Sequence, residues 1–244
     1  MDKSAILVVG HGSRENSANR AFQRLVKQFA ASYPGGKVGH AFLELAHPSI
    51  DKALPSLAAF SSTIIVLPLF LFASGHMKRD IPRILKKFQQ QHPFVTVRLA
   101  KELGPDPLMA RLAYERSQGL KGKPDQTWVL VIGRGAREKK VQADFNRLVR
   151  LYGKDRGFQK VQGCSMGLAI PSIEDSLQKI KHAQPSTLWV VPYLLFPGKL
   201  MVLIRSRMKA FAKAHPSIQV QVGSPMGFHP LLLKILHRRL KIKH

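Results

Sequence analysis

The chain has 244 residues, of which 45% are hydrophobic, and 39 basic against 14 acidic residues give it a formal net charge of +25. This length permits one large or two modest domains with buried cores. A single cysteine excludes an internal disulfide framework, and the longest apolar run, at 64–74, is too short to cross a bilayer. Since no secretory signal is visible at the N-terminus, we expect a cytoplasmic protein without a membrane partner.

Strand and helix patterns alternate along the first half of the chain. A continuous apolar run at 6–9 predicts a strand buried on both faces, and helical spacing over 15–33 predicts a helix that ends before Pro34. The same reading continues as strand 37–43, helix 48–60, strand 62–70, helix 78–91, strand 95–99 and helix 106–118. Strands that alternate with helices favour an open, mostly parallel α/β sheet.

The second half of the chain repeats the first. The segment 129–138, VLVIGRGARE, matches 6–15, ILVVGHGSRE, and the match continues at a constant offset. Strands are expected near 129–132, 161–164, 187–193 and 218–222. The predicted fold class is therefore α/β with two tandem homologous domains, 1–121 and 122–244. Each is expected to be a mostly parallel four-stranded sheet flanked by helices, with a ligand cleft between the two domains.

Differences between the two copies separate folding from chemistry. A residue that both copies keep is interpreted as structural, and His92, which recurs as His215, is one of these. Polar residues that the second copy has lost are candidates for chemistry. The replacements are His11 by Arg134, Glu44 by Gly167, and His76 by Lys199.

The three lost residues follow three strands of the predicted sheet. His11 comes after the first strand, Glu44 after the second, and His76 lies in the predicted loop after the third. Because the carboxyl ends of parallel strands meet at one edge, we expect the three side chains to converge there. Imidazoles and a carboxylate suit divalent first-row metals and can also accept protons near neutral pH. Alternatively, Glu44 could cap the helix that begins near Pro48, and His76 could be a surface loop residue.

Several motifs resemble the class II chelatases of the sirohydrochlorin branch of tetrapyrrole biosynthesis. In the first half these are GHGSR at 10–14, FLELAHPS at 42–49 and PLFLFASGHMKRDIP at 68–82. The second half, with VVPYLLFPGKLM at 190–201 and GFHP at 227–230, is similar to the degenerate second domain of the long, two-domain members. The resemblance covers nearly the whole chain.

The resemblance implies a lyase that inserts Fe²⁺ or Co²⁺ into sirohydrochlorin without ATP and without a tightly bound cofactor. The likeness is closest to the ferrochelatase type that serves sirohaem synthesis, and the cobaltochelatase type of cobalamin biosynthesis is the alternative. The family's catalytic and metal-binding positions fall on His11, Glu44 and His76. An imidazole could act as ligand or base, and Glu44 could orient a histidine, bind metal or carry a proton away.

Sirohydrochlorin is a polycarboxylate, so a basic cleft is expected to attract it. The substrate-binding candidates are hydrogen-bond donors and cations near the predicted site. They are Gly10, Gly12, Ser13, Arg14, Lys78 and Arg79, together with Arg134 and Lys199, which are expected to line the other side of the interdomain cleft.

Two other functions stay open at this point. A carrier would hold a tetrapyrrole or a metal ion without chemistry, and a nucleic-acid-binding protein would account for the charge alone. The basic residues are spread along the helices, without zinc-finger spacing or an aromatic-interleaved motif, so no nucleic-acid partner is expected. Because the duplication supplies both halves within one chain, we expect a monomer.

Overall fold

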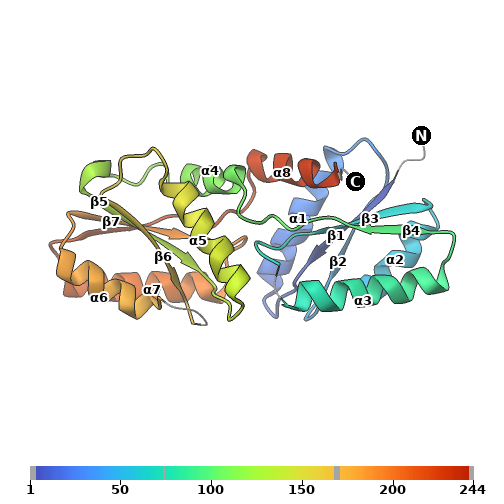
Figure 1. Cartoon of the computed structure of the whole chain (residues 1–244), viewed down its shortest axis with the longest axis horizontal. Helices are drawn as coiled ribbons and strands as arrows, with labels where there is room; N and C mark the ends of the chain where they lie inside the picture. Colours follow the sequence, from blue (N-terminus) through green and yellow to red (C-terminus); the bar gives the residue numbers. More distant parts are fainter. Residues whose placement is uncertain (1–3, 74, 168–170, 242–244) are drawn as a thin grey trace. The chain divides into compact units, whose positions relative to one another are not determined.

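The computed structural model describes residues 4–73, 75–167 and 171–241, which form two four-stranded parallel sheets (Figure 1). The first sheet has the order β2-β1-β3-β4, and the second has the order β6-β5-β7-β8. The strands of the first sheet are β1 (Ala5–Gly10), β2 (Val38–Phe42), β3 (Thr63–Pro68) and β4 (Thr96–Leu99). Those of the second are β5 (Thr127–Gly133), β6 (Lys160–Ser165), β7 (Thr187–Pro192) and β8 (Gln219–Val222). The predicted tandem parallel sheets are therefore confirmed.

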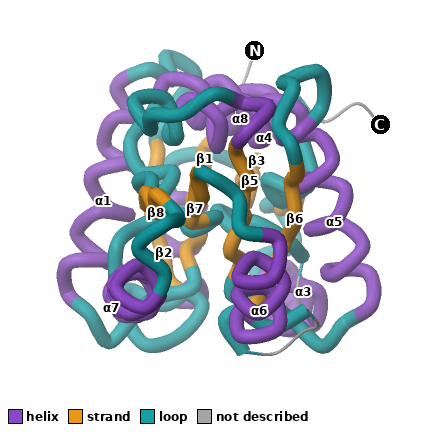
Figure 2. Tube along the Cα trace, turned by 90° about the vertical axis from the view of Figure 1, so that its left-hand side faces the viewer, coloured by secondary structure: helices purple, strands orange, loops and turns teal. Residues whose placement is uncertain are grey.

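A helix follows each strand. The first half contains α1 (Asn16–Ala31), α2 (Ile50–Ala58), α3 (Gly75–Gln91) and α4 (Pro107–Glu115). The second half contains the short 3₁₀ helix η1 (Pro124–Gln126), then α5 (Lys139–Gly153), α6 (Ile173–Ala183), α7 (Lys199–Ala214) and α8 (Pro230–Leu240). In the second sheet, α5 lies beside β6 and α7 beside β8 (Figure 2). Both sheets thus have the open α/β arrangement whose ligand sites lie at the carboxyl edge, near the point where the strand order reverses.

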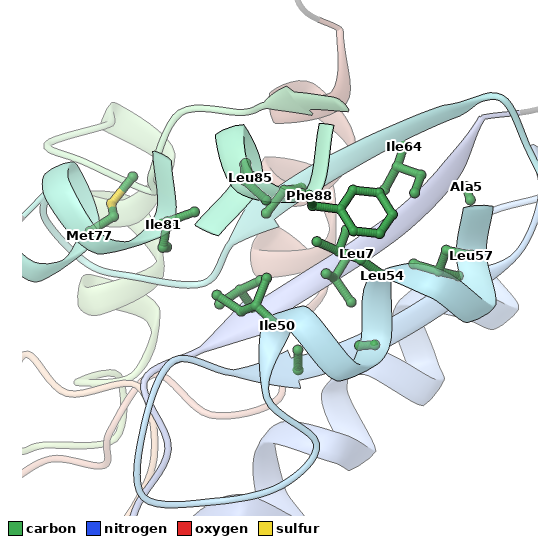
Figure 3. Packing of buried hydrophobic residues seen from close by; sticks show 14 of the residues in the cluster. Ala5, Leu7, Ile50, Leu54, Leu57, Ile64, Met77, Ile81, Leu85 and Phe88 are labelled. Atoms are coloured by element: carbon green, nitrogen blue, oxygen red, sulfur yellow. The ribbon is translucent and has the colours of Figure 1, made fainter. Parts of the chain in front are cut away.

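The start of α3 differs from its prediction. The helix begins at Gly75, earlier than the expected start at Lys78, and therefore includes His76. The physical reason is Met77, which is 5% exposed and belongs to the same buried cluster as Ile81 (Figure 3). This spacing of four residues continues the apolar face of the helix back through its first turn.

The core of the first sheet explains why β1 is continuously apolar. Leu7 packs with residues of α2 and α3 on one face (Figure 3). Ile6 and Val8, which alternate with Leu7 along the strand, are buried on the opposite face. The core on the Leu7 face includes Ile50, Leu54 and Leu57 of α2, and Ile81, Leu85 and Phe88 of α3. A strand covered on both faces can carry no exposed polar side chain, so chemistry must begin where β1 ends.

The compact units do not follow the repeat boundaries. One unit comprises the residues up to Gly104 together with those from Pro230, and the other comprises Pro105–His229. We call them the first and second units. Hence α8 belongs to the first unit, where it contacts β3, and α4 belongs to the second, where it contacts α5. The sequence domains 1–121 and 122–244 have exchanged their last helices.

The exchanged helices occupy matching places. His237 on α8 lies with its ring 5.0 Å from that of Phe29 on α1. In the second unit, Tyr114 on α4 lies with its ring 6.0 Å from that of Tyr152 on α5. Phe29 matches Tyr152 in the repeat, and Tyr114 matches His237. Each helix therefore completes the same structure in the unit formed mainly by the opposite half of the chain.

His92 and His215 also have matching surroundings. The His92 ring stacks on Phe88 at the end of α3, with centroids 4.3 Å apart. The His215 ring lies 4.6 Å from that of Phe211 at the end of α7. The interpretation of this conserved pair as structural is confirmed, because each imidazole packs on the last aromatic residue of its helix.

The exchange predicts that a polypeptide of residues 1–121 will not fold cooperatively as a monomer. It would lack α8, whose Leu232, Ile235 and Leu236 are fully buried. Burial of such side chains stabilises by about 2 kcal/mol each, and their sum is comparable to the whole stability of a small domain. Circular dichroism and thermal unfolding measure the effect, and adding residues 122–244 in trans is expected to restore a cooperative transition. A monomeric 1–121 with the transition temperature of the whole chain would contradict the prediction.

Candidate active site

The pairing of β1 with β2 continues past the ends of both strands. The Leu43 N–H donates to the Gly10 carbonyl at 2.9 Å, and the Glu44 N–H donates to the His11 carbonyl at 3.0 Å. The backbone thus delivers His11 and Glu44 to the carboxyl edge as neighbours. His11 Nε2 lies 3.2 Å from Glu44 Oε1, and the two side chains are 33% and 42% exposed. The structure brings these two residues together in a place that solvent reaches.

Gly12 allows the chain to make this approach. Its φ is +90°, and a Cβ there would lie 1.7 Å from the Glu44 carbonyl oxygen. A side chain at this position would have to push the segment after β2 away from β1. The second half keeps a glycine with a similar φ, +86°, at Gly135. Gly12 therefore has a folding role that both copies share, and a substrate contact through its amide stays a prediction.

Gly10 has a different folding role. A Cβ at Gly10 would lie 2.9 Å from Cε2 of Phe22, and a Cβ at the matching Gly133 would lie 3.0 Å from Cε2 of Phe145. Both glycines let an aromatic ring of the following helix pack against the end of the central strand. The contact between the Gly10 amide and the substrate likewise stays a prediction.

Phe70 forms an apolar wall beside the histidine. Its ring centroid lies 6.1 Å from that of His11, and Phe70 is 7% exposed. The preceding Leu69 N–H donates to the Val9 carbonyl at 2.8 Å, which fixes this segment to the end of β1. Sequence reasoning missed Phe70 as a site residue. The available signal was a difference between the copies: the apolar run beyond β3 carries Phe70 where the matching run of the second copy carries Leu194.

His76 lies in the first turn of α3, the helix that follows β3, and not in a loop as predicted. The backbone of His76 therefore lies at the N-terminal end of the helix that follows the third strand, at the carboxyl side of the sheet. The His76 side chain lies outside the described part of the structure.

The alternative reading of Glu44 as a helix cap is wrong. The N-cap residue of α2 is Ser49, and the first acidic residue of that helix is Asp51. A hydrogen bond from Ser49 lowers the pKa of Asp51, so this carboxylate is the one that serves the helix start. The Glu44 carboxylate is instead directed to His11.

Most of the predicted substrate-binding side chains lie at or just before the starts of helices. The Ser13 hydroxyl oxygen accepts a hydrogen bond from the Glu15 N–H at 3.0 Å, so it organises the start of α1. Arg14, before α1, and Lys78 and Arg79, in the first turn of α3, are exposed. Arg134 and Lys199 are exposed in the second unit, after β5 and at the start of α7.

Charge at the carboxyl edge of the first sheet is unbalanced. Neither α1 nor α3 has an acidic residue in its first turn, where acidic residues usually offset the positive end of the helix dipole, although Glu15 is the N-cap residue of α1. The nearby Arg14, Lys78 and Arg79 add positive charge to these helix starts. Such an edge favours a ligand with several negative groups.

The described residues supply only part of a metal-binding site. Within the described residues, which leave out the His76 side chain, no group of three histidine, cysteine, aspartate or glutamate side chains could hold a metal ion. His11 and Glu44 supply one nitrogen and one carboxylate, a pair that suits borderline divalent metals.

Both halves of the chain match the model of one known protein family. The CbiX family model matches residues 5–120 and, a second time, residues 128–243. The chain therefore belongs to the CbiX family and carries the family domain twice. The expected resemblance is confirmed, and the two matches follow the sequence repeats, whereas the compact units follow the helix exchange.

Relatives with curated names support this placement. A Priestia megaterium protein named sirohydrochlorin ferrochelatase is 30% identical over 243 residues, which cover 97% of this chain and 89% of the relative. Another from the same organism, named sirohydrochlorin cobaltochelatase, is 27% identical and covers 96% and 78%. The solved structure "SirB from Bacillus subtilis with Fe3+" superposes with a TM-score of 0.88 at 27% identity, covering 98% and 94%. Across the described part of this chain, the helices are too short or too polar to span a membrane.

Proposed function

We propose that this protein is a sirohydrochlorin chelatase, a lyase that inserts a divalent metal ion into sirohydrochlorin without ATP. The observation that carries the proposal is the His11–Glu44 pair, 3.2 Å apart at the carboxyl edge of only one of two homologous sheets. Relatives that align over nearly the whole chain bear ferrochelatase and cobaltochelatase names.

The chemistry asks for a base and for a metal ligand. Metallation of the macrocycle removes two pyrrole N–H protons as the ion enters. A neutral His11 imidazole can accept a proton or coordinate the incoming ion, and Glu44 can orient this ring or take the proton onward. We include His76 in the same set, because it follows the adjacent strand of the same sheet. Phe70 limits the solvent on one side of His11.

We propose Fe²⁺ as the metal substrate, with no tightly bound cofactor. The ferrochelatase relative is 30% identical and its aligned share is 89%, against 27% and 78% for the cobaltochelatase relative. The alternative is Co²⁺, because the same ligand types accommodate both ions. We further propose that the protein acts in the cytoplasm as a monomer, in line with a single cysteine and with both halves in one chain.

The test is anaerobic absorbance of the purified protein with sirohydrochlorin, with Fe²⁺ and Co²⁺ offered separately. Acceleration over the buffer control supports a chelatase, and the ratio of the two rate constants selects the metal. Binding of the macrocycle without acceleration would overturn the proposal and would define a carrier.

Removal of two charges near the site is expected to weaken substrate binding. The double variant Lys78→Ala plus Arg79→Ala should raise the KM for sirohydrochlorin roughly tenfold and leave kcat unchanged. Exposed ion pairs contribute up to about 1 kcal/mol each, so two lost contacts have about this effect. The matched control is Lys86→Ala plus Lys87→Ala, which removes the same charge further along α3.

Steady-state kinetics at low and at physiological ionic strength separate the two double variants. Equal increases in KM for both would show that only net charge matters and would remove Lys78 and Arg79 as contacts. The same measurement on Arg134→Ala plus Lys199→Ala tests the proposed contacts in the second unit, and an unchanged KM would remove these.

A further inference from the structure

We propose that Arg239, on the exchanged helix α8, is a positioning residue for the catalytic pair of the first unit. The proposal rests on the proposed function and assigns part of it to a residue from the far end of the sequence. The support is indirect: Arg239 acts through backbone segments that lie between it and the pair formed by His11 and Glu44.

The first step is the contact of Arg239 with the chain after β4. Its Nε donates to the Glu102 carbonyl at 2.9 Å, and its Nη2 donates to the Leu103 carbonyl at 2.6 Å. A planar guanidinium with two directed donors holds two successive carbonyls in a fixed orientation, which a lysine cannot do. Leu103 is fully buried, so this segment is firmly placed.

The second step leads from this segment to the chain after β3. The Leu103 N–H donates to the Phe70 carbonyl at 3.0 Å, and the Gly104 N–H donates to the Leu71 carbonyl at 3.0 Å. Leu103 is thus bound on its carbonyl side by Arg239 and on its amide side by Phe70. Movement of segment 102–104 would be transmitted directly to segment 70–71.

The third step is the contact of Phe70 with the catalytic pair. The Phe70 ring lies 6.1 Å from the His11 ring, which in turn lies 3.2 Å from Glu44. A shift of Phe70 therefore changes both the position and the surroundings of the imidazole. Displacements of about 1 Å can reduce rates by up to about 10²-fold, so a loss of this support should affect kcat.

The second unit contains a related arrangement without the catalytic pair, in which the arginine binds two carbonyls that are two residues apart and not successive. Arg116, at the matching position after α4, donates to the Met226 carbonyl at 2.6 Å and to the Phe228 carbonyl. There the Met226 N–H donates to the Leu194 carbonyl at 2.8 Å. Both arginines thus hold a loop segment in place. Only the segment held by Arg239 is connected, through Phe70, to His11. Arg116 is therefore a matched control.

The experiment compares Arg239→Ala with Arg116→Ala in the whole chain. We expect similar losses of thermal stability, but a roughly tenfold lower kcat only for Arg239→Ala, with the KM for sirohydrochlorin within about twofold. Arg239→Lys is expected to recover part of the stability and little of kcat, since it restores charge without the two directed bonds. Equal kcat values for the two alanine variants, or a change in KM alone, would overturn the proposal.

A double-mutant cycle tests the route through Phe70. In a Phe70→Leu background, Arg239→Ala is expected to lower kcat by much less than in the wild type, whereas the effect of Arg116→Ala should be additive. Additivity of Arg239→Ala with Phe70→Leu would exclude Phe70 as the link.

An NMR measurement tests the positioning role of Arg239 independently of the proposed function. The Cε1–H signal of His11 is expected to shift in Arg239→Ala and Arg239→Lys but not in Arg116→Ala, because the ring of Phe70 moves. This result requires no turnover, so a wild type that fails to insert metal would refute the proposed function alone. An unshifted His11 signal in folded Arg239 variants would refute the positioning role.

Discussion

Replacement of His11 with alanine is expected to lower the rate constant of metal insertion by about 10²–10⁴-fold, the usual contribution of a positioned acid or base. The imidazole is the group that can accept a pyrrole proton or bind the incoming ion, and it is the side chain that the Glu44 carboxylate contacts at 3.2 Å. Since the His11 side chain is one-third exposed, its removal should cost little stability. Anaerobic absorbance under single-turnover conditions measures the rate constant directly.

The repeat supplies the control for this experiment. Arg134 occupies the position that matches His11, so Arg134→Ala makes a truncation at the same structural place in the second unit. It should leave the rate constant of the chemical step within about twofold. If His11→Ala retained a rate constant within about threefold of the wild type, the base and the metal ligand would have to lie elsewhere, and the proposed site would be wrong.

Substitution of Gly12 with alanine should damage both the fold and the site. A Cβ 1.7 Å from the Glu44 carbonyl oxygen cannot be accommodated, so the segment after β2 must move away from β1. A left-handed conformation costs about 1–2 kcal/mol for alanine, and the forced displacement adds about 1–3 kcal/mol. Because the displaced segment carries Glu44, loss of metal-insertion activity should accompany the loss of stability.

Gly119→Ala is the matched control for this substitution. Gly119 has a similar φ of +98°, but a Cβ there would meet nothing within 4 Å. Only the conformational cost of about 1–2 kcal/mol applies, and activity should be preserved. Denaturant unfolding gives the two free energies. A Gly12→Ala variant as stable and as active as Gly119→Ala would show that the approach of Glu44 to Gly12 is not required.

Much of the fold followed from local sequence patterns. The strand at 6–9 was predictable because a run buried on both faces leaves no alternation to confuse it, and β1 indeed spans Ala5–Gly10. The comparison of the two copies isolated His11 and Glu44, since packing preserves residues in both halves and chemistry is needed in one. The meeting of these two residues followed from parallel topology alone.

What escaped prediction depends on contacts between distant segments. The pattern of α4 marks an amphipathic helix but contains nothing that says which sheet will receive it, and the exchange with α8 was therefore invisible. Likewise, the sequence motif indicates Gly12 as a possible amide donor, whereas its closest steric constraint comes from the Glu44 carbonyl. The sequence pattern marks Phe70 only as part of an apolar strand, because its proximity to His11 exists only in three dimensions.

The exchange of helices has a consequence for the order of synthesis. A ribosome completes all four strands of the first sheet by Leu99, yet α8, which covers part of this sheet, begins only at Pro230. At the usual elongation rates of about 5–20 residues per second, the unit that carries His11 must wait roughly 7–28 s for its last helix to be complete. A nascent chain that has not yet reached α8 therefore leaves exposed the apolar surface on which Leu232, Ile235 and Leu236 pack, and the first unit is complete only once this helix has been made.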